Sequence, residues 1–366
     1  MKCLNDYRMR MVLVAVVAAI VVDGGGANAD FTFGEPKNLG PTVNSPAGEV
    51  CPSISPDGLE LYFHSPDLSG GYGNGDLWMS RRTTTDDPWE TPTNVGRVVN
   101  SPSYEYNPVI SSDGLSLYFM SSRSGGYGLG DIWVSTRLTL NDPWEEPVNL
   151  GSTINSSSSE TRVALPADGL ELYFDASERP GGYGDSDLWT TKRATREDAW
   201  STPVALPIPL NTAEYDGQPA ISADGLLLLF RSKRSGGIGA NDMWMTKLST
   251  RDNAWGTPVN LGSAVNSTVS EAGPSISADG KVLYFHSARP GGFGSHDIYS
   301  APIIPIVDLN GDGIVDADDM CFMVDYWGTD EPLCDIGPMP WGDGIVDVQD
   351  LIVLAEHLFE EFPPAL

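Results

Sequence analysis

The chain has 366 residues, a formal net charge of −29 at pH 7 and a hydrophobic fraction of 40%. This length allows one large domain and one small domain. The excess of carboxylates argues against nucleic-acid binding, which needs clustered Lys and Arg, and suits an exported protein that holds metal ions.

Residues 1–29 have the parts of a secretory signal peptide. A basic start precedes a 12-residue apolar run, Met11 to Val22, and the small-x-small cleavage pattern Ala27-Asn28-Ala29 follows. Twelve apolar residues are too few for a membrane span. We therefore predict a secreted protein, extracellular or periplasmic, with no membrane span after cleavage. The alternatives are an uncleaved anchor and a helix of the protein core.

An Asp-Gly turn recurs five times, at steps of 56, 55, 56 and 55 residues. A fixed period of this kind indicates stacked supersecondary units. The turns are Asp57-Gly58, Asp113-Gly114, Asp168-Gly169, Asp224-Gly225 and Asp279-Gly280.

Each repeat predicts four short strands. In the first repeat we expect an inner strand at Pro52 to Ser55, a second strand at Glu60 to Ser65 and a third at Asp76 to Ser80. An outer strand is expected after Trp89-x-x-Pro92. Four strands per unit favour a mainly β fold, a five-bladed β-propeller over residues 30–303.

The ends of the repeat region predict how the propeller closes. The Trp-x-x-Pro segment is missing after the fifth repeat, and Phe33-x-x-Pro36 followed by Asn38-Leu39-Gly40 precedes the first. We therefore expect residues 31–40 to supply the outer strand of the last blade, which removes the exposed edges. The third repeat departs from the pattern, because Ala205 to Asn211 lacks Asn-Leu-Gly.

The motifs SxDGxxLYF, GGxG and D[IL]W, over about residues 31–303, resemble the WD40-like propeller repeats of bacterial exported proteins, including the Tol-system periplasmic propeller. The resemblance implies a binding or scaffolding surface. It implies no reaction, because one fold hosts many functions.

A carboxylate stands eight residues before each Asp of the Asp-Gly turns: Glu49, Glu105, Glu160, Asp216 and Glu271. One interpretation is a ligand face, a ring of acids that holds a cation or a cationic ligand. The other is structural, with each acid pairing with an Arg of its own repeat or capping a backbone turn. Fivefold recurrence favours the structural interpretation, because an asymmetric ligand needs an asymmetric site. The arginines are Arg123, Arg179, Arg234 and Arg289, and the first repeat has none.

Aromatic residues also recur, at Trp78, Trp133, Trp189, Trp244 and Tyr299. We expect them in the core between blades rather than stacked on sugars. The Asp residues that precede them are expected to fix loops: Asp76, Asp131, Asp187, Asp242 and Asp297.

The sequence offers little for catalysis. Its four histidines stand outside HExxH and GxSxG contexts, and there is neither a P-loop nor a dinucleotide fingerprint. We therefore expect a non-catalytic binding or scaffold protein whose ligand is a polysaccharide or a peptide. The alternative is a carbohydrate-active enzyme similar to five-bladed glycoside hydrolases, which act on O-glycosyl compounds with two carboxylates in distinct environments.

A calcium-binding loop is predicted after the Pro-rich link at residues 302–307. Oxygen ligands fall at positions 1, 3, 5, 9 and 12 of an EF-hand-like loop, with Gly at position 6 and a backbone carbonyl at position 7. In order these residues are Asp308, Asn310, Asp312, Asp316 and Asp319, with Ile314 giving the carbonyl.

A second loop repeats positions 5, 7, 9 and 12 as Asp343, Ile345, Asp347 and Asp350. Met339 and Trp341 stand at its positions 1 and 3, so Asp335 replaces the first ligand if the segment from Gly337 to Trp341 bulges out as an insertion. Apolar helix patterns follow the two loops, at residues 320–327 and 351–359.

These tandem loop–helix units, over residues 304–362, resemble a type I dockerin. That family implies a calcium-folded module that docks onto a cohesin-like protein, often in polysaccharide-degrading assemblies. Positions 10 and 11 depart from the usual Ser-Thr-like pair, being Ala317-Asp318 and Val348-Gln349. The alternative is a cap, or an anchor to a cell-surface component. Spacing leaves open whether Cys321 and Cys334 form a disulfide.

Overall fold

The computed structural model describes residues 31–248, 250–251, 253–305, 307, 309, 314–329, 334–337 and 345–358. The chain divides into two compact units, one of residues 33–302 and one that combines the residues from Ile303 onward with those up to Thr32. The expected signal peptide lies outside the described residues. None of the helices in the described part combines the length and hydrophobicity that a membrane span requires.

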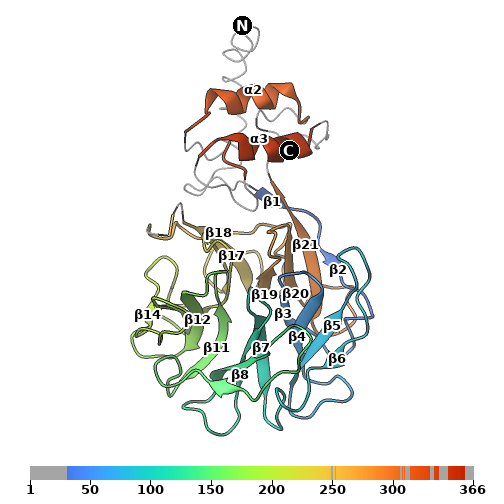
Figure 1. Ribbon diagram of the computed structural model, residues 1–366, viewed down its shortest axis with the longest axis vertical. Coiled ribbons are helices and arrows are strands. Elements are labelled where there is room, and N and C mark those ends of the chain that lie inside the picture. The colour runs from blue at the N-terminus through green and yellow to red at the C-terminus, as the bar shows by residue number, and fades with distance from the viewer. Residues whose placement is uncertain are drawn as a thin grey trace. The chain divides into compact units, whose positions relative to one another are not determined.

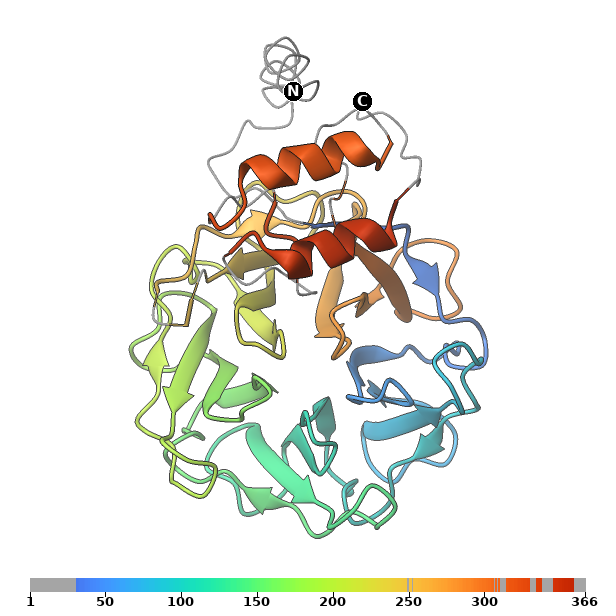
Figure 2. The same ribbon diagram turned by 45° about the horizontal axis from the view of Figure 1, so that its top comes forward.

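Residues 33–302 form a five-bladed β-propeller, which confirms the predicted fold class for this unit (Figures 1 and 2). The first four blades each consist of four strands in chain order. The first blade contains β3 (Val50–Ile54), β4 (Glu60–Ser65), β5 (Asp76–Arg81) and β6 (Thr93–Asn94), and the second contains β7 (Glu105–Ile110), β8 (Ser116–Ser121), β9 (Asp131–Thr136) and β10 (Val148–Asn149). The third blade contains β11 (Ser159–Ala164), β12 (Glu171–Ser177), β13 (Ser186–Lys192) and β14 (Val204–Ala205), and the fourth contains β15 (Asp216–Ile221), β16 (Leu227–Ser232), β17 (Asp242–Lys247) and β18 (Val259–Asn260).

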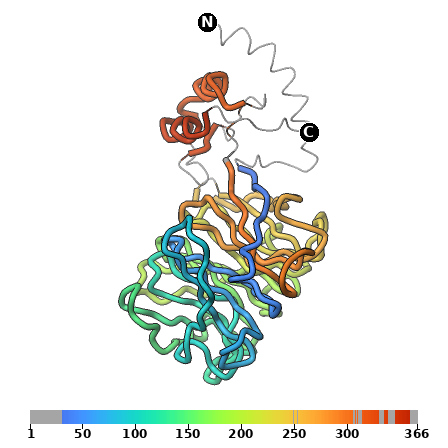
Figure 3. Tube along the Cα trace, turned by 90° about the vertical axis from the view of Figure 1, so that its right-hand side faces the viewer, coloured from blue at the N-terminus to red at the C-terminus, as the bar shows by residue number. Residues whose placement is uncertain are grey.

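The fifth blade contains strands from both ends of the repeat region. It consists of β19 (Glu271–Ile276), β20 (Val282–Ser287) and β21 (Asp297–Pro305), with β2 (Lys37–Asn38) paired antiparallel to β21. Asn38 stands opposite Tyr299, so residues 31–40 close the ring as predicted. The predicted segment forms two short strands instead of one, because β1 (Phe31–Phe33) also pairs with β21; Figure 3 shows this blue segment running alongside the orange one.

The inner strands carry β-bulges near their middles, where the register with the second strand shifts. Three bulge residues adopt positive φ angles although they are not glycine: Cys51 at 55°, Asn107 at 52° and Gln218 at 53°. A bulge bends its strand and re-aims side chains. The fifth blade has Gly273 at this position, with a φ of 64°.

The apolar core lies between neighbouring blades. In one cluster, Tyr62 and Leu77 of the first blade pack with Leu117, Phe119 and Trp133 of the second. The recurrent aromatics are buried, so the prediction that they form core is confirmed: Trp78, Trp133, Trp189, Trp244 and Tyr299.

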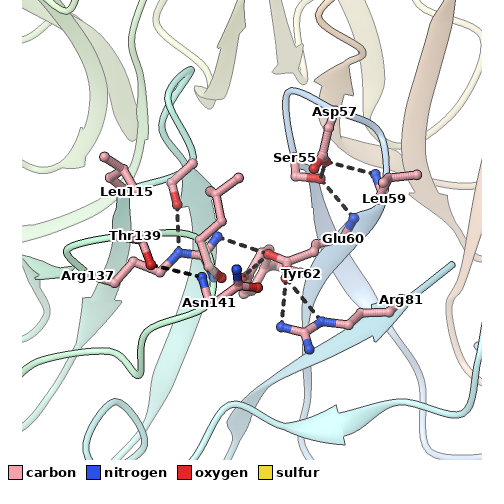
Figure 4. A network of polar contacts seen from close by, with 12 residues as sticks. Ser55, Asp57, Leu59, Glu60, Tyr62, Arg81, Leu115, Arg137, Thr139 and Asn141 are labelled. Carbon is pink, nitrogen blue, oxygen red and sulfur yellow. Dashed lines mark hydrogen bonds and ion pairs between the residues drawn. The ribbon is translucent and has the colours of Figure 1, made fainter. Parts of the chain in front are cut away.

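Polar contacts also tie adjacent blades at the Asp-Gly turns (Figure 4). Glu60 accepts hydrogen bonds from Arg81 of its own blade at 2.8 Å and from Arg137 of the next blade at 3.1 Å. The Tyr62 hydroxyl donates to the same carboxylate at 2.7 Å. One acid therefore connects two blades.

The described residues of the C-terminal unit include two helices, α2 (Ala317–Asp325) and α3 (Val348–Glu356). Each begins three residues before the predicted apolar pattern, because loop positions 10 to 12 already form its first turn. The helices pack on a small core that consists of Val307, Leu309, Val315, Met323, Cys334, Ile336, Val346, Val353 and Leu354.

Candidate functional site

The five recurrent carboxylates lie inside the blades, each with 0% of its surface exposed: Glu49, Glu105, Glu160, Asp216 and Glu271. Glu105 accepts hydrogen bonds from the Ser101 amide and hydroxyl at 2.9 and 2.6 Å, and its Oε1 lies 3.2 Å from Arg123. The other blades repeat this arrangement, with Arg179, Arg234 and Arg289 as the cations. The ligand-face interpretation is therefore corrected: these acids fix the links between blades, and their burial leaves no open ring.

The first blade has no such arginine. Glu49 accepts from the Ser45 amide at 2.7 Å and the Ser45 hydroxyl at 2.6 Å, and burial raises its pKa. The serine contacts are thus enough to place the carboxylate.

The recurrent Asp residues fix loops, as predicted. Asp76 accepts from the amides of Tyr72 at 2.6 Å and Gly73 at 3.1 Å, and from Asn94 at 2.7 Å. In the third blade the asparagine is replaced by Ala205, which pairs with Trp189 in the sheet. Asp187 consequently has one oxygen without a hydrogen-bond partner among the described residues.

The bulge residues contact one another across the propeller axis. Arg162 of the third blade donates to the carbonyls of Pro52 in the first blade and Pro274 in the fifth, at 3.0 and 2.8 Å. Gln218 of the fourth blade contacts the Cys51 sulfur of the first at 3.6 Å. Contacts between blades that are not neighbours place these residues at the axis.

The repeats differ most where the second strand passes this axis. The residue after the buried Phe of that strand changes from blade to blade: His64, Met120, Asp175, Arg231 and His286. We define the axial cluster as His64, Tyr104, Tyr106, Asp175, Tyr215, Arg231, Asn241, His286 and His296. The sequence contained its signal, which is variation at an inward position of an otherwise regular repeat.

One half of the axial cluster is aromatic. The His64 ring lies edge-on to Tyr104 and Tyr106, with centroids 5.1 and 4.8 Å apart, and the two tyrosines stack at 5.6 Å. His64 is buried and the tyrosines are half-buried. Part of each tyrosine's surface therefore remains exposed.

The other half is charged. Asp175 accepts from the Thr161 hydroxyl at 2.7 Å and from the Tyr215 hydroxyl at 3.3 Å. Arg231 lies 4.5 Å above the Tyr215 ring and donates to Asn241 at 2.9 Å. These contacts hold a cation, an acid and a phenol in fixed positions.

Burial governs the titration of the cluster. It raises the pKa of the Asp175 carboxyl, raises the pKa of Tyr104 to about 12 and lowers the pKa of His64 to about 3. Burial also lowers the pKa values of His286 and His296, and the cation of Arg231 acts in the same direction. The histidines are therefore neutral at pH 7.

Replacing His64 with Phe is expected to weaken the loss of stability in mild acid. An unfolded histidine binds its proton below about pH 6.5, whereas folded His64 does so only near a pKa of about 3. Between these values His64 makes the free energy of unfolding fall as pH falls, by about 1.4 kcal/mol per pH unit. Urea titrations at several pH values check this. A constant difference between the two proteins from pH 6.5 to 4 would refute it.

The described parts of the two predicted calcium loops are alike. Asp316 and Asp347 cap the helices with φ −145° in both cases, and Asp319 and Asp350 complete the capping boxes and are fully buried. Ile314 and Ile345 are exposed, as residues that offer only a carbonyl can be.

The structure describes one of the remaining predicted ligands. Asp308, Asn310, Asp312 and Asp343 lie outside the described residues, and Asp335 is described and half-buried. Gly337 donates to Asp350 at 2.7 Å, so the chain after Asp335 lies against the second loop. Within the described ranges no group of three or more His, Cys, Asp or Glu gathers as a metal site. The aspartate-rich, twice-repeated arrangement fits Ca²⁺, and its binding stays a prediction.

No protein-family model matches the chain, and no curated protein matches it. Among solved structures it is similar to TolB from Acinetobacter baumannii, with a TM-score of 0.43 and 15% identity over 70% of this chain and 54% of that one. It is also similar to an α-L-arabinofuranosidase from Podospora anserina, with a TM-score of 0.47 and 13% identity over 75% of this chain and 98% of that one. A thermostable family-43 glycoside hydrolase is similar with a TM-score of 0.49 and 13% identity over 71% of this chain and 91% of that one. The chain thus spans about half the length of TolB. At these identities a likeness bears on the fold alone.

Proposed function

We propose that this protein is an exported, non-catalytic binding protein. Its propeller holds a polysaccharide or peptide ligand at the axial cluster. Its C-terminal unit is a calcium-dependent, dockerin-like module that attaches it to a cohesin-like protein or a cell-surface component. The observation that carries the proposal is the asymmetry of the axial cluster within an otherwise regular fold.

The chemistry of the axial cluster supports binding of a partly apolar, polar-edged ligand. Tyr and Arg are the side chains that contribute most at binding sites, because they combine large contact areas with hydrogen bonds. Tyr104 and Tyr106 offer ring edges to a sugar or a peptide side chain. Arg231 offers a positive charge that orients polar groups, and Asp175 holds the Tyr215 phenol in place beside it.

The hydrolase alternative has weaker support. Asp175 is the one carboxylate among the residues that define the axial cluster, and it is fully buried and occupied by Thr161 and Tyr215. Glycoside hydrolysis requires two carboxyl groups flanking the bond, about 5–9.5 Å apart. A binding role needs no second acid.

Docking through the C-terminal unit is supported by exposed apolar side chains on its described helices and just after the first of them. Trp327 is 46% exposed, and Val324, Val348 and Ile352 are between 54% and 59% exposed. Exposed apolar residues gathered on a small unit are typical of partner-binding surfaces.

Screening the purified full-length protein on polysaccharide and peptide arrays tests the proposal. We expect retention of at least one ligand class with no release of sugars or peptides into solution. Reproducible product release would favour the hydrolase instead. A cohesin array, probed with calcium and then with chelator, tests the attachment; capture that ignores the chelator would contradict the calcium-dependent module.

A further inference from the structure

A pocket of about 100 Å³ lies at the opposite end of the inner strands from the axial cluster. Its rim includes exposed residues of the first-to-second-strand turns, such as Ser112, Ala223 and Ala278, so it opens to solvent. The lining residues come from all five blades, and the pocket therefore surrounds the propeller axis.

Arg162 contributes to this pocket from the axis. The residue is 2% exposed, and one amino group of its guanidinium donates to the carbonyls of Pro52 and Pro274. The Nε and Nη1 atoms have no hydrogen-bond partner among the described residues. No described carboxylate forms an ion pair with it. Its electrostatic neighbours are the Cys51 side chain and, after it, Asp175, whose carboxylate accepts from the Arg162 backbone amide at 3.1 Å.

A buried guanidinium without a counter-ion is unusual. Burying an uncompensated charge is costly, and an isolated charge of this kind is normally paired or coordinated. Arginine stays protonated, so the molecule cannot relieve the cost by losing a proton. An anion that enters the pocket would supply the missing partner through charge-assisted hydrogen bonds.

The pocket wall has two chemically different halves. Ser53 and Ser275 come from the first and fifth blades, and each hydroxyl oxygen accepts a backbone amide from the adjacent blade, at 3.0 and 3.2 Å. Their hydroxyl hydrogens therefore remain available to a ligand. The same inner-strand position in the other blades is apolar, being Val109, Ala164 and Ala220.

We propose that this pocket binds a carboxylate carried on a small, apolar group. The carboxylate pairs with Arg162 and the serine hydroxyls, and the apolar body packs on the alanine and valine side. A free short-chain acid and the C-terminal residue of a peptide share this chemistry. The pocket is separate from the axial cluster, so this proposal does not depend on the ligand proposed for that cluster.

Titration calorimetry on the full-length protein tests the proposal with isobutyrate and its neutral counterpart isobutyramide. We expect the acid to bind about 10- to 100-fold more tightly than the amide, because charge-assisted hydrogen bonds are lost in the amide. The peptide Gly-Gly-Val with a free or an amidated C-terminus forms the second arm. If isobutyrate binds and the peptide does not, the ligand class is small free acids. If the peptide with a free C-terminus binds, the ligand class is the C-terminal end of a peptide chain.

Three variants complete the experiment. Arg162→Met is expected to remove the preference for the acid, whereas Arg97→Met, which removes an exposed arginine outside the pocket, leaves it unchanged. Ala220→Leu keeps Arg162 and fills the apolar half, so it is expected to weaken binding as well. Equal binding of acid and amide to the wild-type protein, or undiminished acid binding by a folded Arg162→Met protein, would overturn the proposal.

Discussion

Chelation of calcium is expected to unfold the C-terminal unit and to leave the propeller folded. The unit has a small apolar core, and domains of this size usually need a metal or disulfides for stability. Asp319 and Asp350 are buried at the first turns of α2 and α3, where a bound cation would compensate their charge. Helical circular dichroism should fall after exhaustive dialysis against chelator and return with calcium, while the β signal persists.

A point variant separates metal binding from capping. Asp312→Ala removes a predicted ligand that takes no part in either capping box, so it should reproduce the effect of chelator at the first loop. A helical signal that is indifferent both to chelator and to this variant would contradict the calcium assignment.

Arg234→Ala is expected to destabilise the propeller by about 3–5 kcal/mol, because it leaves a buried carboxylate without its counter-ion. Arg234 lies 2.7 Å from Asp216 and also donates to Ser232 at 2.8 Å and to the Pro209 carbonyl at 2.9 Å. The two side chains are 9% and 0% exposed. Since domains are stable by only about 5–15 kcal/mol, this is a large fraction of the total.

Arg81→Ala is the matched control. Arg81 lies 2.8 Å from Glu60, close to the 2.7 Å of the Arg234 pair, but its side chain is 54% exposed. Its loss should therefore cost less than about 1 kcal/mol. Denaturant unfolding of both variants decides the point. Equal losses would show that the recurrent arginines do not stabilise the blades through the buried acids.

The regular part of the fold was predictable because local chemistry determines it. The Asp-Gly turn and the strand Glu60 to Ser65 occur where the pattern placed them. The first inner strand begins at Val50, two residues earlier than predicted. Its bulge needs a positive φ at Cys51, and a non-glycine residue gives no sequence signal for that conformation.

The candidate site was less predictable, because recurrence reports on the fold rather than on the ligand. The acids that recur, such as Glu105, are buried and fix the links between blades. The residues that differ, such as His64 and Arg231, form the axial cluster. The contact of Arg162 with Pro274 joins blades that are not neighbours, and no local pattern indicates such a contact.

The central claim is that the axial cluster is the binding site. The most direct test measures the affinity of two variants for the ligand retained in the array screen. Arg231→Ala removes a half-buried cation from the cluster, and Arg97→Ala removes an exposed cation outside it. We predict a loss of about tenfold or more for Arg231→Ala, as for other central binding residues, and no change for Arg97→Ala, with both proteins folded. Equal affinity of wild type and a folded Arg231→Ala protein would contradict the account.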